Sequence, residues 1–291
     1  MLDKEYILNF VPTGMVPRSA DSKYVPLTMD RILEDIAKVE AMGVTMVHLH
    51  VRDEKEESTL CVKRYGELIT EVRKLNPELI VCVSCSGRKT PDLESRLAPL
   101  QLTGDAKPDM ASLTPTSLNF PRQASITEPA TAVELAREML KRGIVPELEV
   151  FDVGMLNVVK YLRNRGFLRD PCYVNFLLGN LTTAQCEPGV LGHLIAGLPE
   201  GACWAAGGLG FSQFPANALA LASGGGVRVG LEDNLFLDSD RTQLATNHDL
   251  VERARRMAAI LGRRVMRPAT LRKRLGMLPG HGEYGRSPWH E

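Results

Sequence analysis

The stretch TMDRILEDIAKVEAMGVTMVHLHVRD, residues 28–53, contains one complete unit of a helix followed by a strand. From Ile32 its apolar residues recur at three- and four-residue steps, which is typical of an amphipathic helix. Thr28 would cap the start of this helix, and Gly43 would end it. The near-continuous apolar run that begins at Val44 is typical of a parallel strand buried on both faces. The stretch therefore predicts a helix packed against a parallel sheet.

Similar units fill most of the chain. Besides Val44, apolar runs bounded by turn residues begin at Tyr6, Leu79, Asp109, Pro146, Cys172, Ala202 and Val227. A second clear helix is expected to open at Glu128 and Pro129 and to end at Gly143. Eight such units predict a single (β/α)8 TIM barrel over residues 1–267. Residues 268–291 lack the pattern, and we expect a C-terminal tail that either packs on a neighbouring subunit or stays mobile.

A doubly wound parallel sheet is the alternative fold. A dinucleotide-binding sheet of that kind places a GxGxxG pattern at its first strand-to-helix turn. Residues 12–26 read PTGMVPRSADSKYVP and lack the pattern. The sequence therefore favours the barrel.

The charge balance and the apolar runs exclude several classes of partner. The chain has 35 Lys and Arg against 35 Asp and Glu with no basic block, so we expect no nucleic-acid partner. No apolar run reaches membrane-spanning length, and the start MLDKEYILNFVP lacks a signal-peptide cleavage site, so we expect a cytoplasmic protein. Cys82 and Cys85 form a CxxC, but strand alternation would point them to opposite faces, against a shared metal or redox role.

The strand that begins at Val44 ends in two histidines. Alternation along a strand places His48 and His50 on one face, so that two imidazoles converge. Hydrogen-bonded packing is one interpretation, but neutral imidazole is a common metal ligand, and barrel active sites lie at the C-terminal ends of the strands. A catalytic ion needs at least one more protein ligand, for which Glu232 in VRVGLED is the candidate. Zn²⁺ fits these donors, as do Mn²⁺, Fe²⁺ and Co²⁺.

Other predicted strands also end in polar residues. Glu232 and Asp233 follow Arg228, and adjacent carboxylates at a strand end need a cation to offset their repulsion. Glu147 and Glu149 share one face of PELEVFD, although Glu147 could lie at the bottom of the barrel. Hydroxyl donors for an anionic ligand close the third and fourth strands, at Ser84, Ser86, Ser112 and Thr114.

Together the strand-end sequences HLHVRD, VSCSG, PELEVFD and VRVGLEDN resemble those of the β-keto acid cleavage enzyme family. The resemblance implies a TIM barrel that forms a homotetramer. It implies zinc bound by the residues His48, His50 and Glu232. It also implies that the catalytic residues are Asp233, Arg228 and Ser84. The substrate-binding residues that it implies are Gly87, Ser112 and Glu149.

The resemblance implies an activity as well. Family members join a β-keto acid to acetyl-CoA and release acetoacetate and a new acyl-CoA through Claisen and retro-Claisen steps, with Asp233 here as the base. Members that take 3-keto-5-aminohexanoate carry an acidic residue after the first strand, where this chain has Met15. Met15 cannot pair with an ammonium group, so we expect a substrate other than the amino compound.

Three alternatives stay open at this point. A metal-dependent aldolase without CoA would use the same ligands. A metal-dependent hydrolase would need further histidines at strand ends, where none is predicted. A non-catalytic binding protein is the third alternative, because fold does not fix function. Contacts to the CoA phosphates are not assigned, although Arg88, Lys89 and Arg122 are candidates.

Overall fold

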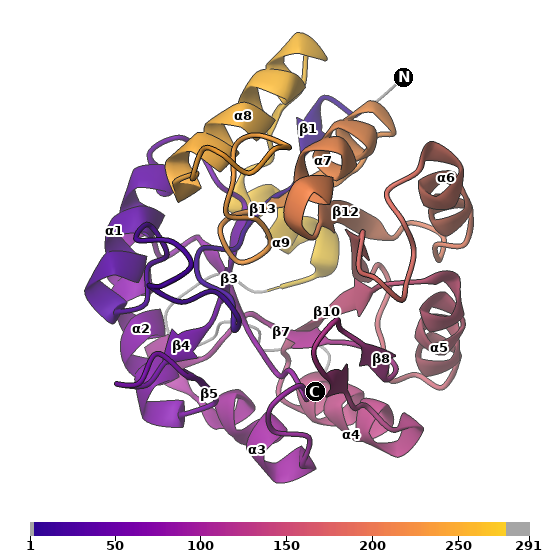
Figure 1. The fold of residues 1–291 in the computed structure, drawn as a ribbon. Helices are drawn as coiled ribbons and strands as arrows, with labels where there is room; N and C mark the ends of the chain where they lie inside the picture. The colour runs from indigo at the N-terminus through magenta and orange to yellow at the C-terminus, as the bar shows by residue number, and fades with distance from the viewer. Residues whose placement is uncertain (1–2, 278–291) are drawn as a thin grey trace.

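The computed structural model describes residues 3–277, and these form a barrel ringed by helices (Figure 1). Eight parallel strands close on one another, each pairing with its neighbours along the chain, and β13 pairs with β2. The fold prediction of a TIM barrel is confirmed, and the open doubly wound sheet is excluded. The barrel strands are β2 (Leu8–Phe10), β3 (Met46–Leu49), β6 (Ile80–Val83), β7 (Met110–Leu113), β10 (Val145–Val150), β11 (Tyr173–Leu178), β12 (Cys203–Gly208) and β13 (Gly226–Val229).

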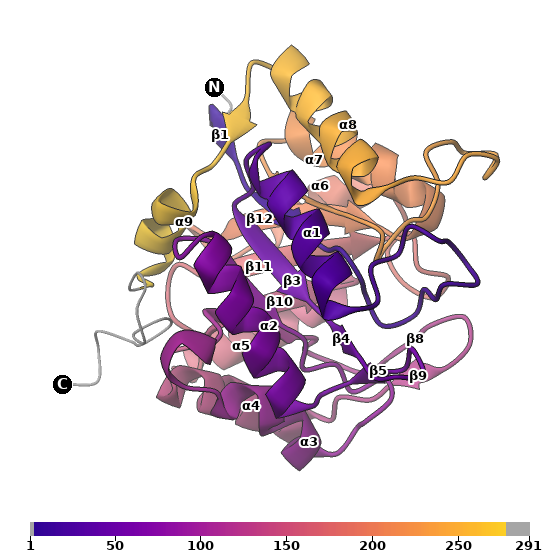
Figure 2. The ribbon, with the colours of Figure 1, turned by 90° about the vertical axis from the view of Figure 1, so that its left-hand side faces the viewer.

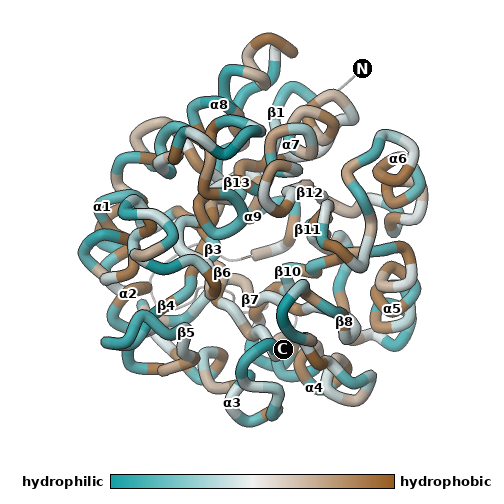
Figure 3. Tube along the Cα trace, viewed as in Figure 1, coloured by the Kyte–Doolittle hydropathy of each residue, from teal (hydrophilic) through white to brown (hydrophobic). Residues whose placement is uncertain are grey.

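One principal α-helix follows each barrel strand and packs outside it. These helices are α1 (Met29–Glu40), α2 (Val62–Leu75), α3 (Leu93–Leu97), α4 (Pro129–Lys141), α5 (Val153–Asn164), α6 (Pro188–Ala196), α7 (Gln213–Ala222) and α8 (Asn247–Ile260). Short 3-10 helices occupy Ala98–Gln101, Gly104–Ala106 and Gly210–Ser212. Hydrophobic and hydrophilic residues alternate along the surrounding helices, as amphipathic packing requires (Figure 3). Within residues 3–277, no helix combines the length and apolar character needed to span a bilayer.

The expected helix boundaries rest on local hydrogen bonds. The Thr28 hydroxyl accepts from the backbone N–H of Arg31 and caps α1. Pro129 occupies the first turn of α4, where its missing N–H leaves no intrahelical bond unmade. After α1 the chain enters β3, whose four residues are all buried, because the barrel interior lies on one side and the helices on the other.

Three small strand pairs complete the ends of the barrel. β1 (Glu5–Tyr6) pairs in parallel with β14 (Arg264–Val265). Two hairpins, β4 (Val51–Arg52) with β5 (Ser58–Thr59) and β8 (Leu118–Asn119) with β9 (Ala124–Ser125), follow the C-terminal ends of β3 and β7. Figure 2 shows these hairpins at the opposite end of the barrel from α9 (Pro268–Leu275).

Helix α9 closes the base of the barrel. Leu271 and Leu275 pack in one apolar cluster with Met46, Ile80 and Met110 from the barrel strands. Beside them Arg272 forms ion pairs with the fully buried Asp109, which also pairs with Arg73 from α2. Residues 268–277, which the sequence analysis assigned to a tail, therefore pack on the chain's own barrel.

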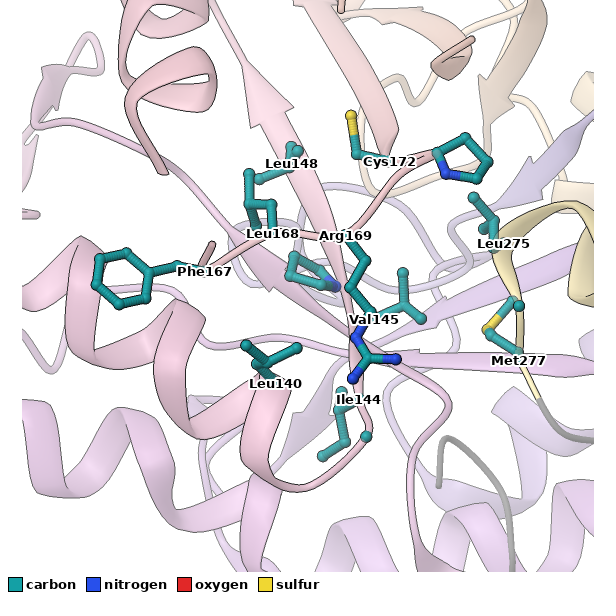
Figure 4. Close-up of a pocket in the computed structure, with 14 residues that line it drawn as sticks. Leu140, Ile144, Val145, Leu148, Phe167, Leu168, Arg169, Cys172, Leu275 and Met277 are labelled. Carbon is teal, nitrogen blue, oxygen red and sulfur yellow. The ribbon is translucent and has the colours of Figure 1, made fainter. Parts of the chain in front are cut away.

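The predicted tail beyond residue 277 lies outside the described residues. Near its start, an apolar cavity lies between α4, the segment 167–172 and α9 (Figure 4). Leu140, Ile144, Phe167 and Met277 are among its lining residues. The cavity adjoins the N-terminal ends of β10 and β11, away from the hairpins.

Candidate active site

The two histidines and Glu232 meet at the C-terminal end of the barrel, as the sequence analysis expected. His48 is the last residue but one of β3 and has its side chain in the barrel interior, and His50 follows two residues later on the same face. Their Nε2 atoms lie 3.2 Å apart. Glu232, in the turn after β13, brings its Oε1 to 3.3 Å from His50 Nε2. The histidines and Glu232 are far apart in the sequence, but they meet because β13 and β3 both adjoin β2.

These three residues fit a divalent ion. A tetrahedral ion with metal-to-ligand distances of about 2.0–2.1 Å holds its ligand atoms roughly 3.3 Å apart, close to the separations found here. Glu232 Oε2 is buried without a hydrogen-bond partner among the described residues, and such an oxygen can serve as a ligand. His48, His50 and Glu232 each offer a ligand atom within 4.8 Å of the others.

Glu147 supports His48 from below. Its Oε2 lies 2.5 Å from His48 Nδ1, and its Oε1 accepts from the side-chain amides of Asn9 at 2.5 Å and Asn175 at 3.1 Å. Burial lowers the pKa of His48, but the carboxylates of Glu147 and Glu232 together outweigh this effect and raise the pKa to about 9. A carboxylate on the far ring nitrogen fixes the orientation of a metal-binding histidine. Glu147 thus lies beneath the site, within reach of His48.

A second group, His48, Cys82 and Glu147, also brings three donor atoms together. All three are fully buried, so an ion there would lack the open position that a substrate needs. Burial and the adjacent Glu147 carboxylate hold the pKa of the Cys82 thiol well above its usual value, which disfavours the thiolate that binds metals. Cys85 packs in the outer core, on the opposite face from Cys82. The group at Glu232 is the better metal site.

Arg228 ties the acidic residues of the site together. Its guanidinium lies within 3.9 Å of carboxylate oxygens from Glu147, Glu149, Glu232 and Asp233. Arg228 Nε donates to Asp233 Oδ2 at 2.9 Å. Burial raises the pKa of Asp233 above its ordinary value, while Arg228 opposes the increase. Four carboxylates around one arginine leave excess negative charge, which a divalent cation would offset.

Two glycines allow the loops to approach this closely. Gly14 has a φ of 65°, and a Cβ on it would lie 2.6 Å from Glu232 Cγ. Gly230 has a φ of 154°, and a Cβ there would lie 2.1 Å from the Val11 carbonyl oxygen. Only glycine fits both backbone positions, so the turns that carry Met15 and Glu232 depend on them.

A cavity opens above the histidines, between the strand ends and the hairpin of β8 and β9. Met15, Ser84, Glu149, Arg228, Glu232 and Asp233, all singled out from the sequence, line this cavity. The full lining is Met15, Val16, His50, Ser84, Ser86, Arg88, Thr114, Phe120, Ser125, Glu149, Phe151, Leu177, Leu209, Arg228, Glu232 and Asp233.

Two predicted substrate-binding residues lie elsewhere. The Ser112 hydroxyl accepts from the backbone N–H of Cys85 and links β7 to the end of β6. Gly87 packs under the segment before α4, where a Cβ would lie 2.5 Å from the Ile126 carbonyl oxygen. Neither residue lines the cavity, because the Ser112 hydroxyl faces the backbone of Cys85 and the Cα of Gly87 faces the backbone of Ile126. Ser84 lines it, but its hydroxyl oxygen accepts from Ser86 N–H rather than bonding Asp233.

Other residues in the cavity or beneath it were missed by the sequence or only weakly indicated by it. Thr114 donates to Glu149 Oε2 at 3.0 Å, and its place at a strand end was the only signal for it. Phe120 and Phe151 pack edge to face and form part of the wall, but their sequence surroundings carry no motif. Asn9 and Asn175 face inward from β2 and β11, where a polar residue in an apolar run marks an interior contact.

The three candidate phosphate contacts separate in the structure. Lys89 is exposed and forms an ion pair with Glu57, and Arg122 is exposed in the turn between β8 and β9. Arg88 turns into the cavity, where its Cζ lies 3.3 Å from the centroid of the Phe120 ring. The histidines that a hydrolase would need are absent from the cavity in residues 3–277, since His193 and His248 are exposed on α6 and α8.

Comparison with known proteins finds related sequences over most of the chain. A family model described as beta-keto acid cleavage enzyme matches residues 5–277. A 3-oxoadipate:acetyl-CoA acetyltransferase of Cupriavidus necator is 33% identical over 97% of this chain and 98% of its own length. A 3-keto-5-aminohexanoate cleavage enzyme of Fusobacterium nucleatum is 33% identical over 87% of this chain and 91% of its own.

Solved structures share the fold. The ternary complex of ObcA with a C4-CoA adduct and oxalate superposes with a TM-score of 0.78 at 21% identity. The match covers 88% of this chain and 68% of that chain. At this identity the likeness supports the barrel architecture alone.

Proposed function

The chain belongs to the β-keto acid cleavage enzyme family, and on that premise we propose that its cavity binds a β-keto acid beside a zinc ion. As a member, the protein is an acyltransferase that uses acetyl-CoA and cleaves a carbon–carbon bond of a β-keto acid. The observation that supports this site is the convergence of His48 Nε2, His50 Nε2 and Glu232 beside Asp233, where His50, Glu232 and Asp233 line one cavity.

His48, His50 and Glu232 are the proposed zinc ligands. When bound, a divalent ion there would supply Lewis-acid polarisation of the substrate oxygens. Glu147 would keep the His48 proton on Nδ1, so that Nε2 presents its lone pair to the site. Gly14 allows the loop after β2 to pass directly over Glu232 and hold that carboxylate in place.

Asp233 is the proposed base. It would remove a proton from the carbon between the carboxylate and keto groups of the substrate, leaving an enolate. Its raised pKa makes Asp233 a stronger base than an exposed carboxylate, and the Arg228 hydrogen bond fixes its orientation. Ser84 lines the same cavity and is proposed to contact the substrate.

The remaining bonds change between substrate and co-substrate. The enolate carbon attacks the thioester carbonyl of acetyl-CoA, and the CoA thiolate leaves. The thiolate then attacks the original keto carbon, and the bond from that carbon to the former α-carbon breaks. Acetoacetate leaves after Asp233 returns the proton, and the new acyl-CoA carries the rest of the substrate. Atoms and charges balance without a further reactant.

The cavity argues against an amine-bearing substrate. Relatives are named for 3-keto-5-aminohexanoate and for 3-oxoadipate, so the distal end group differs among them. Here the loop after β2 presents Met15, and Val16, Leu177 and Leu209 add apolar wall. An ammonium group would lose water against this wall without an ionic partner at Met15. We propose a substrate other than the 5-amino compound.

Elemental analysis of purified protein tests the metal site. We expect stoichiometric zinc in the wild type and its loss in His48→Ala, together with loss of acetoacetate formation from acetyl-CoA and a β-keto acid. His193→Ala, on the exposed face of α6, is the matched control and should retain both. Cys82→Ala should also retain zinc, and loss of zinc there would favour the deeper ligand group instead.

The proposed assembly is a homotetramer, as the family resemblance implies. Light scattering coupled to size-exclusion chromatography measures it directly. A monodisperse species of four chains is expected, and a monomer or dimer would contradict this part of the proposal.

A further inference from the structure

Arg88 is a cation in the cavity without an anionic partner. It follows β6, and its guanidinium stacks on Phe120, with 3.3 Å between Cζ and the ring centroid. Among residues 3–277 it forms no ion pair within 4.0 Å, and its Nε is buried without a hydrogen-bond partner. Arg228, on the same cavity, is by contrast bonded to Glu232 and Asp233. The two arginines therefore have different roles.

The surroundings hold Arg88 in this position. Phe120, from the hairpin of β8 and β9, provides a flat surface for the guanidinium. Gln123 from the same hairpin donates to the Arg88 carbonyl oxygen and ties the two loops together. Burial lowers the pKa of Arg88 to about 10, and the carboxylates of the site offset only part of this effect. A part-buried guanidinium with open donors is a preorganised anion site.

Three anionic groups could reach this cavity: the carboxylate beside the keto group, a carboxylate at the far end of the substrate, and a CoA phosphate. The first must lie next to Asp233, which removes the adjacent proton. Arg88 forms no ion pair with Asp233 or Glu232, which are both bonded to Arg228 instead, so its guanidinium is not committed to the reacting end. The residue beside it is the apolar Phe120, and Phe151 and Leu209 line the same cavity, which suits the methylene chain of a substrate better than a nucleotide.

We propose that Arg88 binds a second, distal carboxylate, so that the preferred substrate is a β-keto diacid. This inference rests on the proposed function and specifies its substrate class. A planar guanidinium can accept a carboxylate through two parallel hydrogen bonds, and the stacked ring leaves its edge free for them. Met15 is compatible with this substrate, because it places no negative charge near the second carboxylate.

The test compares two substrates of equal carbon number, 3-oxoadipate and 3-oxohexanoate, which differ in the distal carboxylate. Acetoacetate and acyl-CoA formation give kcat/KM for each with wild type, Arg88→Met and Arg88→Lys. Because hydrogen bonds to charged groups contribute about 1.5–3 kcal/mol, Arg88→Met should lower kcat/KM for the diacid by roughly 10- to 150-fold. The monoacid should change by less than about threefold, and Arg88→Lys should restore part of the diacid activity.

Lys89→Met is the matched control, since Lys89 is adjacent in sequence, exposed and outside the cavity lining. It should leave both substrates unchanged. Circular dichroism and zinc content of Arg88→Met should equal those of the wild type, which separates a binding defect from a folding defect.

Four outcomes would overturn the proposal. Equal loss for both substrates would place the shared carboxylate at Arg88. A raised KM for acetyl-CoA alone would place a CoA phosphate there. Wild-type turnover of the monoacid but not the diacid would reject the diacid while leaving the proposed function intact. No turnover of either acid with acetyl-CoA would reject the proposed function itself, and this inference with it.

Discussion

Replacing Glu147 by glutamine tests how the barrel interior prepares the metal site. The change keeps the shape of the side chain but turns one carboxylate oxygen into an NH2 group. If the NH2 takes the place of Oε1, it faces the donating amides of Asn9 and Asn175. If it takes the place of Oε2, it faces His48 Nδ1, which must then give up its proton. His48 would carry that proton on Nε2, the atom aimed at the metal.

Either arrangement carries a definite energetic cost. A buried donor without an acceptor costs about 1–3 kcal/mol. Rotating the amide of Asn9 or Asn175 only moves the unpaired NH2 to another buried position. Loss of such a supporting partner typically lowers metal affinity by about 10- to 100-fold. The two magnitudes agree, because each factor of ten corresponds to about 1.4 kcal/mol.

The assay is a zinc titration of metal-free protein in competition with a chromophoric chelator at neutral pH. Glu149→Gln is the matched control, because Glu149 is two residues away on the same face of β10 and bonds Thr114 rather than His48. It should keep the zinc affinity and lose turnover. If Glu147→Gln binds zinc as tightly as the wild type and unfolds at the same temperature, the supporting role assigned to Glu147 is wrong.

Three further predictions concern the loop at Gly14, the buried ion pairs of Asp109 at the bottom of the barrel, and the pH dependence of zinc binding. Gly14→Ala should lower stability by about 1–3 kcal/mol through its positive φ, and it should also weaken zinc binding by displacing Glu232. Gly104 has a similar φ of 61° but open space around it, so Gly104→Ala should lower stability in thermal melts without affecting zinc binding. Equal zinc affinity in the two variants would contradict the close contact between position 14 and Glu232. Asp109→Asn should lower the free energy of unfolding by about 3–5 kcal/mol in urea, because two buried guanidinium groups lose their carboxylate. A loss below about 1 kcal/mol would contradict this. The pKa of His48 is raised to about 9 in the metal-free protein, so below this pH a proton on His48 competes with zinc. The apparent zinc affinity should therefore rise about tenfold per pH unit up to about pH 9 and then level off. A flat profile above neutral pH would exclude this competition.

The sequence predicted the barrel and the meeting of its strand ends for a physical reason. Strands buried on both faces are apolar almost throughout, so polar residues such as His48 or Glu232 stand out where they occur. The C-terminal ends of parallel barrel strands share one rim, so residues far apart in sequence could be placed together. This inference needs only strand order.

The depth of each residue along the barrel axis could not be predicted in the same way. Glu147 reaches His48 because β10 pairs with β7 and β11 in a particular register, and register depends on the stagger of the whole barrel. The contact between Arg88 and Phe120 depends on the hairpin of β8 and β9, which is too short to leave a pattern. Helix α9 has only a brief amphipathic stretch, and its burial becomes visible only once the barrel base is built.

The position of α9 has a consequence for synthesis on the ribosome. The eighth barrel strand ends at Val229, yet within residues 3–277 the apolar layer around Met46 and Met110 packs against Met266, Leu271, Leu275 and Met277, which all follow that strand. A nascent chain can therefore have all its strands outside the exit tunnel while one end of its interior still contacts water. Such an intermediate offers exposed apolar surface to chaperones or to other nascent chains until the last turn of α9 emerges. Emergence of α9 from the tunnel, rather than completion of the barrel strands, is therefore the step that shields this end of the interior from water.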